Sequence, residues 1–134
     1  MMKLKSLVHF SIPVTDLGKS DHFYRHLLGM EKLDGHERMS FLRLGNDHIV
    51  LVKSDTVRAS KSAEGQFRPG VHHAFLVDAD EYDRAKDQLT SNGVRILGEE
   101  LRDQGVFTGR SLYFSDPDGN ELEIIARKVE DTRS

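Results

Sequence analysis

Two short stretches decide the fold: residues 8–14 read VHFSIPV, and residues 71–77 read VHHAFLV. Both are rich in β-branched and aromatic residues, a composition that is typical of strands. Their histidines, His9 and His72, correspond at an offset of 63 residues, and the apolar residues that follow them correspond at the same offset. A repeat of this kind indicates a duplicated structural unit.

Each strand is followed by signals for a helix. Asp16 is expected to cap the first helix and Gly29 to end it. In the second copy the helix is expected to begin at Asp78 or Asp80 and to end at Gly93. A strand and then a helix therefore occur in the same order in both copies.

Short strands complete each copy. Residues 41–44 and 49–52 predict a hairpin around the turn Gly45-Asn46-Asp47, and the second copy shows strand-like segments at 94–97, 111–114 and 122–125. The sequence therefore predicts an α+β fold of two paired β-α-β-β-β modules that form a curved mixed sheet.

Length and composition fit one domain without nucleic-acid or membrane partners. The 134 residues predict a single domain, with module one at about 5–53, a linker at 54–70 and module two at about 71–127. The 19 basic and 22 acidic residues are interspersed and give a net charge of −3, which argues against a nucleic-acid partner. The apolar runs are far shorter than the roughly 20 residues that cross a bilayer, and the start shows no secretion signal, so a cytoplasmic location is expected.

Because the chain contains no cysteine, any metal must be held by histidine and carboxylate. The two repeated histidines, His9 and His72, and Glu123 on the last strand are the candidate ligands. Two imidazoles and one carboxylate leave coordination positions open on Fe(II), Mn(II), Ni(II), Co(II) or Zn(II). The residues alone leave a structural alternative open, in which the histidines are ordinary strand residues and Glu123 is an outward-facing polar side chain. His22 and His26, four residues apart, are expected to belong to a solvated helix face.

Four motifs span nearly the whole chain: VHFSIPVTDL at 8–17, FYRHLLGM at 23–30, HHAFLV at 72–77 and YFSDPDGNELE at 113–123. Together they resemble the vicinal oxygen chelate superfamily, which includes glyoxalase I, fosfomycin-resistance proteins, extradiol dioxygenases and bleomycin-resistance proteins. The resemblance places the metal ligands on His9, His72 and Glu123, with the site between the two modules. It selects His72 over His73, which is expected to face the other side of its strand.

The resemblance also limits which reactions of the superfamily are expected for this chain. Glyoxalase I carries a further ligand on the first hairpin, where the alignment of the two hairpins sets Val50 opposite Glu123. Valine cannot bind a metal, which argues against glyoxalase I chemistry. The three-ligand pattern is closest to that of the fosfomycin-resistance proteins.

Further site residues are expected from the resemblance at positions 11, 110 and 113, and from their place in the chain at positions 37 and 67; for Glu37 a plain surface role is the alternative. Ser11 and Arg110 are expected to contact the substrate, and Phe67 in the linker is expected to cover the pocket. Tyr113 is expected to donate a hydrogen bond to an oxyanion, and Glu37 is the candidate general base.

The leading hypothesis is a metal-dependent enzyme that acts on a small, oxygen-rich substrate by lyase, isomerase, epoxide-opening or dioxygenase chemistry. The rival hypothesis is a metal-free protein that sequesters a drug, as the bleomycin-resistance members do. A third is a ligand-sensing module with a vestigial site. In each case a homodimer is expected.

Overall fold

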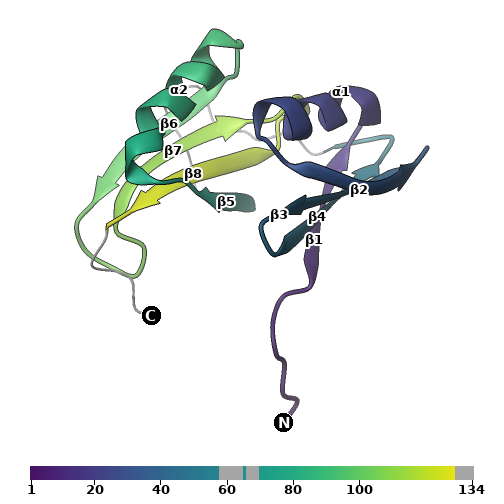
Figure 1. Ribbon diagram of the computed structural model, residues 1–134, viewed down its shortest axis with the longest axis horizontal. Helices are drawn as coiled ribbons and strands as arrows, with labels where there is room; N and C mark the ends of the chain where they lie inside the picture. Colours follow the sequence, from purple (N-terminus) through teal and green to yellow (C-terminus); the bar gives the residue numbers. More distant parts are fainter. Residues whose placement is uncertain (58–64, 66–69, 129–134) are drawn as a thin grey trace. The chain divides into compact units, whose positions relative to one another are not determined.

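The chain divides into two compact units, residues 1–57 and residues 58–134, in a computed structural model that describes residues 1–57, 65 and 70–128. Each unit contains one β-α-β-β-β module, as the sequence repeat predicts (Figure 1). The predicted α+β class and the duplication are therefore confirmed.

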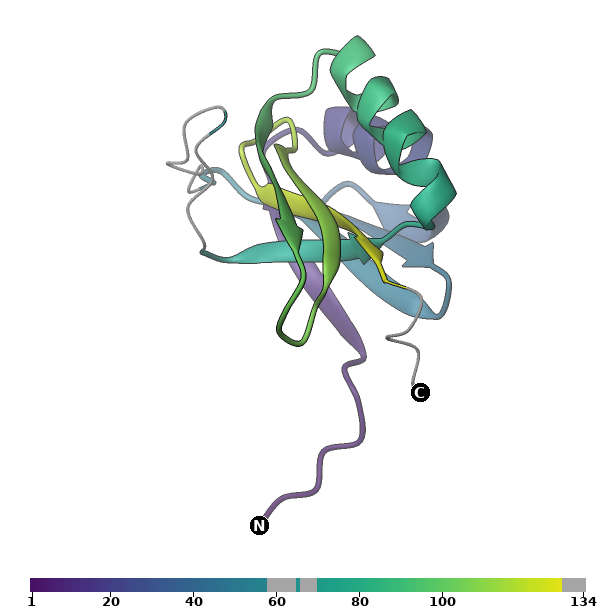
Figure 2. The same ribbon diagram turned by 90° about the vertical axis from the view of Figure 1, so that its left-hand side faces the viewer.

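The first unit is a four-stranded mixed sheet. Its strands lie in the order β1-β4-β3-β2; β1 runs parallel to β4, and the other neighbours are antiparallel. A tail of residues 1–8 precedes β1, the edge strand (Figure 2). The strands and helices are β1 (His9–Val14), α1 (Leu17–His22), η1 (Phe23–Leu27), β2 (Glu31–His36), β3 (Met39–Leu44) and β4 (Asp47–Lys53).

The second unit repeats this topology. Its sheet has the order β5-β8-β7-β6, with β5 parallel to β8. One difference is that α1 continues directly into the π-helical turn η1, whereas α2 is preceded by the 3₁₀ turn η2. The elements are β5 (His72–Leu76), η2 (Ala79–Glu81), α2 (Tyr82–Ser91), β6 (Ile96–Arg102), β7 (Gly109–Ser115) and β8 (Glu121–Arg127).

The helix boundaries follow local sequence signals. The Asp16 carboxylate accepts a hydrogen bond of 3.0 Å from the Lys19 backbone N–H, which caps α1 as predicted. Gly29 and Gly93 follow the two helical segments with φ of 79° and 74°, values that favour glycine. Asp78 precedes η2 without a side-chain cap hydrogen bond, so α2 begins through the 3₁₀ turn instead.

Each sheet buries one face in a small apolar core. Alternate residues of the strands supply these cores, because successive strand side chains point to opposite faces. In the first unit they include Ile12, Val14, Leu42, Ile49 and Leu51, and in the second unit Leu97, Leu112, Phe114 and Leu122. The opposite face of each sheet mixes polar and apolar side chains, such as Ser11 and Val50 in the first unit and Glu123 and Ile125 in the second.

Two strands differ from the sequence prediction. No strand was expected at β2, whose residues EKLDGH are all exposed and therefore lack the apolar alternation of a half-buried strand. β6 extends to Arg102, well beyond the expected end at residue 97, because its C-terminal half is polar and pairs with β7. Most of the expected linker at 54–70, including Phe67, lies outside the described residues.

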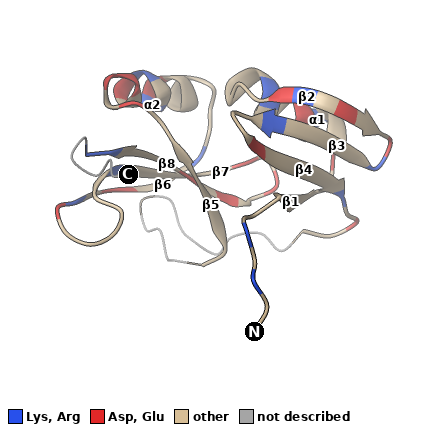
Figure 3. Cartoon of the chain, turned by 60° about the horizontal axis from the view of Figure 1, so that its bottom comes forward, with Lys and Arg blue, Asp and Glu red and all other residues tan. Residues whose placement is uncertain are grey.

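Charges of both signs are interspersed along β2 and α2 (Figure 3). In the part of the chain that the structure describes, no helix combines the length and the apolar character that a membrane crossing requires.

Candidate metal centre

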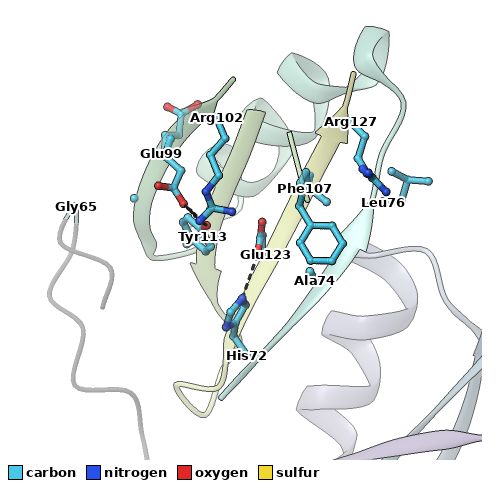
Figure 4. A pocket seen from close by; sticks show the side chains of 13 residues that line it. Gly65, His72, Ala74, Leu76, Glu99, Arg102, Phe107, Tyr113, Glu123 and Arg127 are labelled. Atoms are coloured by element: carbon cyan, nitrogen blue, oxygen red, sulfur yellow. Dashed lines mark hydrogen bonds and ion pairs between the residues drawn. The ribbon is translucent and has the colours of Figure 1, made fainter. Parts of the chain in front are cut away.

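The face of the second sheet opposite its apolar core carries a pocket of about 820 Å³. Alternate residues of β5 and β8 form its floor, and β6 and β7 contribute one wall (Figure 4). The residues lining the pocket include His72, Ala74, Leu76, Glu100, Arg102, Phe107, Tyr113, Glu123, Ile125 and Arg127.

His72 and Glu123 meet in this pocket. The Nε2 atom of His72 lies 3.1 Å from Oε1 of Glu123, whose side chain is 7% exposed. The other ring nitrogen of His72, Nδ1, lies 2.9 Å from the carbonyl oxygen of Gly70. Because a carbonyl oxygen only accepts hydrogen bonds, Nδ1 carries the ring proton and donates a hydrogen bond to the carbonyl oxygen of Gly70.

This arrangement fits a divalent cation. In the neutral imidazole, a proton on Nδ1 leaves a lone pair on Nε2, and that lone pair faces the Glu123 carboxylate, which also only accepts. Two acceptors 3.1 Å apart need a cation or a proton between them. Histidines that bind metals commonly donate their second ring N–H to a backbone carbonyl, as His72 does to Gly70.

The third expected ligand, His9, belongs to the other unit. Within residues 1–57, 65 and 70–128, no group of three or more His, Cys, Asp or Glu side chains is assembled for metal binding. His9 is exposed on β1 and pairs with His48 on β4; in the same way His72 pairs with Glu121 on β8. His9 thus occupies in its sheet the position that His72 occupies in the second sheet.

The strand pairing also bears on Val50. Ser11, two residues after His9, pairs with Val50, and Ala74, two residues after His72, pairs with Glu123. Val50 and Glu123 are therefore equivalent positions, as the alignment of the hairpins predicts. The first module offers an apolar side chain where the second offers a carboxylate.

Tyr113 forms the wall beside the His72–Glu123 pair. Its ring lies edge-on to the His72 imidazole, with 6.0 Å between the ring centroids. Its hydroxyl donates a hydrogen bond of 2.5 Å to Glu100 and accepts one of 3.3 Å from Arg102. Burial and the hydrogen bond to Glu100 raise the pKa of Tyr113 to about 12, so the hydroxyl keeps its proton at neutral pH and can act as a donor.

Sequence reasoning missed Glu100 and Arg102. Arg102 also forms an ion pair with Glu100, so the two side chains and Tyr113 make one network on the wall. The signal was available in the alternation of residues 98, 100 and 102, but it requires a strand that extends to Arg102.

His73 lies on the other side of β5. It pairs with Leu122, a fully buried residue of the helix-covered core, and it does not line the pocket. Burial lowers the pKa of His73, and the charge of His72 lowers it further. The prediction that His72 and His73 face opposite sides of the strand is confirmed.

Arg110 is held on the helix-covered side of β7. It donates a hydrogen bond of 3.1 Å to Asp83 of α2, and its guanidinium lies 4.0 Å from the centroid of the Tyr82 ring. Residues 110 and 113 point to opposite faces of the strand, so the structure sets Arg110 apart from the pocket of Tyr113. The expected contact between Arg110 and the substrate therefore gains no support from the structure.

The other two expected site residues belong to the first unit. Ser11 is exposed on β1, on the same face as His9, because the two lie at alternate positions of one strand. Glu37 is exposed in the turn between β2 and β3.

Comparison with known proteins identifies the family. The chain matches the family model of the Glyoxalase/Bleomycin resistance protein/Dioxygenase superfamily over residues 6–124 and belongs to that superfamily.

Several relatives are fosfomycin-resistance proteins. A metallothiol transferase FosB from Staphylococcus haemolyticus is 29% identical over 131 residues, which cover 98% of this chain and 90% of the relative. A glutathione transferase FosA from Serratia marcescens is 29% identical over 121 residues, covering 90% of this chain and 80% of the relative. Among solved structures, FosX from Listeria monocytogenes complexed with Mn(II) and sulfate has a TM-score of 0.77 and 26% sequence identity. The match covers 96% of this chain and 95% of the FosX chain.

Proposed function

We propose that this protein is a divalent-metal-dependent enzyme that opens a small epoxide or a related oxygen-rich substrate by adding a thiol or water. In this reaction the nucleophile forms a bond to one epoxide carbon, the carbon–oxygen bond breaks, and the freed oxygen takes a proton. The names of FosB and FosA as metallothiol and glutathione transferases, and the FosX complexes with Mn(II), support this class of chemistry.

The observation that carries the proposal is the geometry around His72. Its Nδ1–H is anchored on the Gly70 carbonyl, and its Nε2 is aimed at the buried Glu123 carboxylate. This pair would hold the metal, and we assign His9 as the third ligand on the strength of its equivalent position in the first module. Mn(II) is the first ion to test, followed by Fe(II), Ni(II), Co(II) and Zn(II).

The bound ion would supply Lewis acidity that stabilises the negative charge developing on a substrate oxygen. The chain's own residues would orient the substrate and donate hydrogen bonds to its oxygen. Tyr113 keeps its hydroxyl proton, so it can donate a hydrogen bond to that oxygen in place of its present bond to Glu100. Ser11 is proposed to contact the substrate from the face of His9, and Glu37 is the proposed general base.

The test is turnover of fosfomycin by the Mn(II)-loaded protein, followed by phosphorus NMR with glutathione, with cysteine and with water alone. Turnover in any of these reactions, and its loss in Glu123→Gln, is the expected result. His73→Ala is the matched control, because His73 lies next to His72 in the sequence but on the opposite face. Metal binding without turnover of epoxides would move the assay to catechols with oxygen and to oxo-acids with thiols.

A different result would support the rival function. If the protein binds no divalent ion but still binds small molecules tightly, then it sequesters its ligand without metal chemistry. In that case His72→Ala and Glu123→Gln would leave ligand affinity unchanged.

We also propose that the protein works as a homodimer in the cytoplasm. Exposed apolar side chains near the start of the chain, Leu4, Leu7 and Val8, support this because a partner subunit would remove them from water. Light scattering coupled to size exclusion is expected to give twice the chain mass of 15.2 kDa; a monomer at micromolar concentration would contradict the proposal.

A further inference from the structure

The pocket of the second unit has two chemically different ends. One end holds His72, Glu123 and the Tyr113 hydroxyl, all polar (Figure 4). Farther along β5 and β8, beyond the pair Ala74 and Glu123, the pocket is lined by the apolar side chains of Leu76, Phe107 and Ile125. A substrate that needed only the polar end would leave this apolar lining unused.

The strand spacing sets the length of the pocket. Glu123, Ile125 and Arg127 follow one another at alternate positions of β8, and all three line the pocket. Because a strand rises about 3.3 Å per residue, the backbone positions of Glu123 and Arg127 lie roughly 13 Å apart. An extended chain of six to eight carbons covers roughly half to two thirds of that distance.

The apolar end presents large side chains that are exposed to solvent. Phe107 is 57% exposed and Leu76 is 71% exposed, although both line the pocket. Apolar surface gathered beside a polar site is typical of a pocket that binds the apolar part of a small molecule.

Arg127 brings a positive charge to the far end. Its guanidinium donates a hydrogen bond of 3.1 Å to the Val106 carbonyl and lies 5.4 Å from the centroid of the Phe107 ring. These contacts hold the guanidinium next to the apolar lining, where a carboxylate at the end of a ligand could pair with it.

Resting on the proposed function, we infer that the natural substrate is an elongated molecule with three parts. An oxygen-rich head lies at His72 and Glu123, an apolar body lies against Phe107 and Ile125, and an anionic group pairs with Arg127. Such a molecule is longer than the dihydroxypropylphosphonic acid in one of the FosX complexes, which has three carbons.

Hydroxamic acids test the inference, because they chelate a divalent ion through two adjacent oxygens. The Mn(II)-loaded protein is titrated by calorimetry with acetohydroxamic acid, octanohydroxamic acid and suberic acid monohydroxamate. We expect octanohydroxamate to bind about 30-fold more tightly than acetohydroxamate, because its six further carbons enter the apolar end. The suberic compound, which adds a terminal carboxylate, is expected to bind about fivefold more tightly again.

Two variants and a control test which residues produce the higher affinities of the two longer hydroxamates. Phe107→Ser should reduce the advantage of octanohydroxamate to about fivefold, and Arg127→Gln should abolish the gain from the terminal carboxylate. Neither change should alter the affinity for acetohydroxamate. Leu33→Ser, at an exposed apolar residue of the first unit, should leave all three affinities unchanged.

The outcomes separate the inference from the function on which it rests. If acetohydroxamate does not bind in the presence of Mn(II), the proposed metal site is wrong. If acetohydroxamate binds and the octanoyl compound binds no more tightly, the metal site stands and the inferred substrate class is overturned. Loss of self-association in Phe107→Ser, together with equal affinities for the two compounds, would assign the apolar end to a second copy of the chain.

Discussion

Replacement of Glu123 by glutamine should act in opposite directions on the metal-free and the metal-loaded protein. The carboxylate of Glu123 lies 3.1 Å from Nε2 of His72, and the proton of His72 is held on Nδ1 by Gly70. Without a metal, two hydrogen-bond acceptors therefore face each other in a buried place. Glutamine removes the buried charge and can turn an amide N–H toward the lone pair of His72.

The size of the effect follows from that exchange. One new hydrogen bond contributes about 1 kcal/mol to the free energy of unfolding, so we expect the variant to gain about 1 kcal/mol in EDTA, or roughly 4 °C in melting temperature. With Mn(II) at a hundred times its dissociation constant, the wild type gains about 2.7 kcal/mol from binding. The variant lacks the carboxylate ligand and should gain almost nothing at that concentration.

Urea unfolding followed by circular dichroism, with EDTA and with Mn(II), measures both effects. The expected result is a reversal of order, with the variant more stable in EDTA and the wild type more stable in Mn(II). The claim that two acceptors face each other in the metal-free protein is wrong if Glu123→Gln is less stable than the wild type in EDTA by about 2 kcal/mol or more. That outcome would mean that His72 is protonated and that the pair is a buried structural ion pair.

Three further results are expected. Tyr113→Phe should lower kcat about 100-fold because a donor to the developing charge is lost, and the wild-type pH–rate profile should show no titration of Tyr113 below pH 10, since its pKa is about 12. Ser40→Ala should cost about 1–2 kcal/mol in urea unfolding, because the buried Ser40 hydroxyl donates a 2.5 Å hydrogen bond to Asp21. The Lys86 hydrogen bond lowers the pKa of Glu99, so the stability that Glu99 contributes should be present above pH 4.5 and lost as the pH falls through the lowered pKa. Because Glu99 is partly exposed, this contribution should stay below about 1 kcal/mol, and Glu99→Gln measured at pH 7 and pH 3 checks it.

Most of the fold could be read from the sequence because its signals are local. The repeated strands, the Asp16 cap and the glycines after both helices each depend on a few neighbouring residues, and the structure confirms them. β2 could not be recognised, because its side chains are all exposed and its strand conformation comes from pairing with β3. The pairing of β2 with β3 is a tertiary interaction, and no local sequence pattern indicates it.

The faces of the strand residues at the candidate site were easier to predict than the residues that form the walls of the pocket. The strand alternation correctly separates His72 from His73, and the hairpin alignment correctly sets Val50 against Glu123. The sequence alone could not show which face of β7 carries Arg110, because that face depends on the register of the strand, and Arg110 contacts Asp83 of α2. The Gly70 carbonyl that orients His72 carries no sequence signal at all, since any residue offers a carbonyl.

Metal stoichiometry shows whether His9, His72 and Glu123 hold a divalent ion. The purified, untagged protein is dialysed against Mn(II), and its metal content is measured by elemental mass spectrometry. We expect about one ion per chain in the wild type and in His73→Ala. We expect almost none in His9→Ala, His72→Ala and Glu123→Gln. Retention of the ion in Glu123→Gln, or no ion in the wild type, would contradict the proposed metal site.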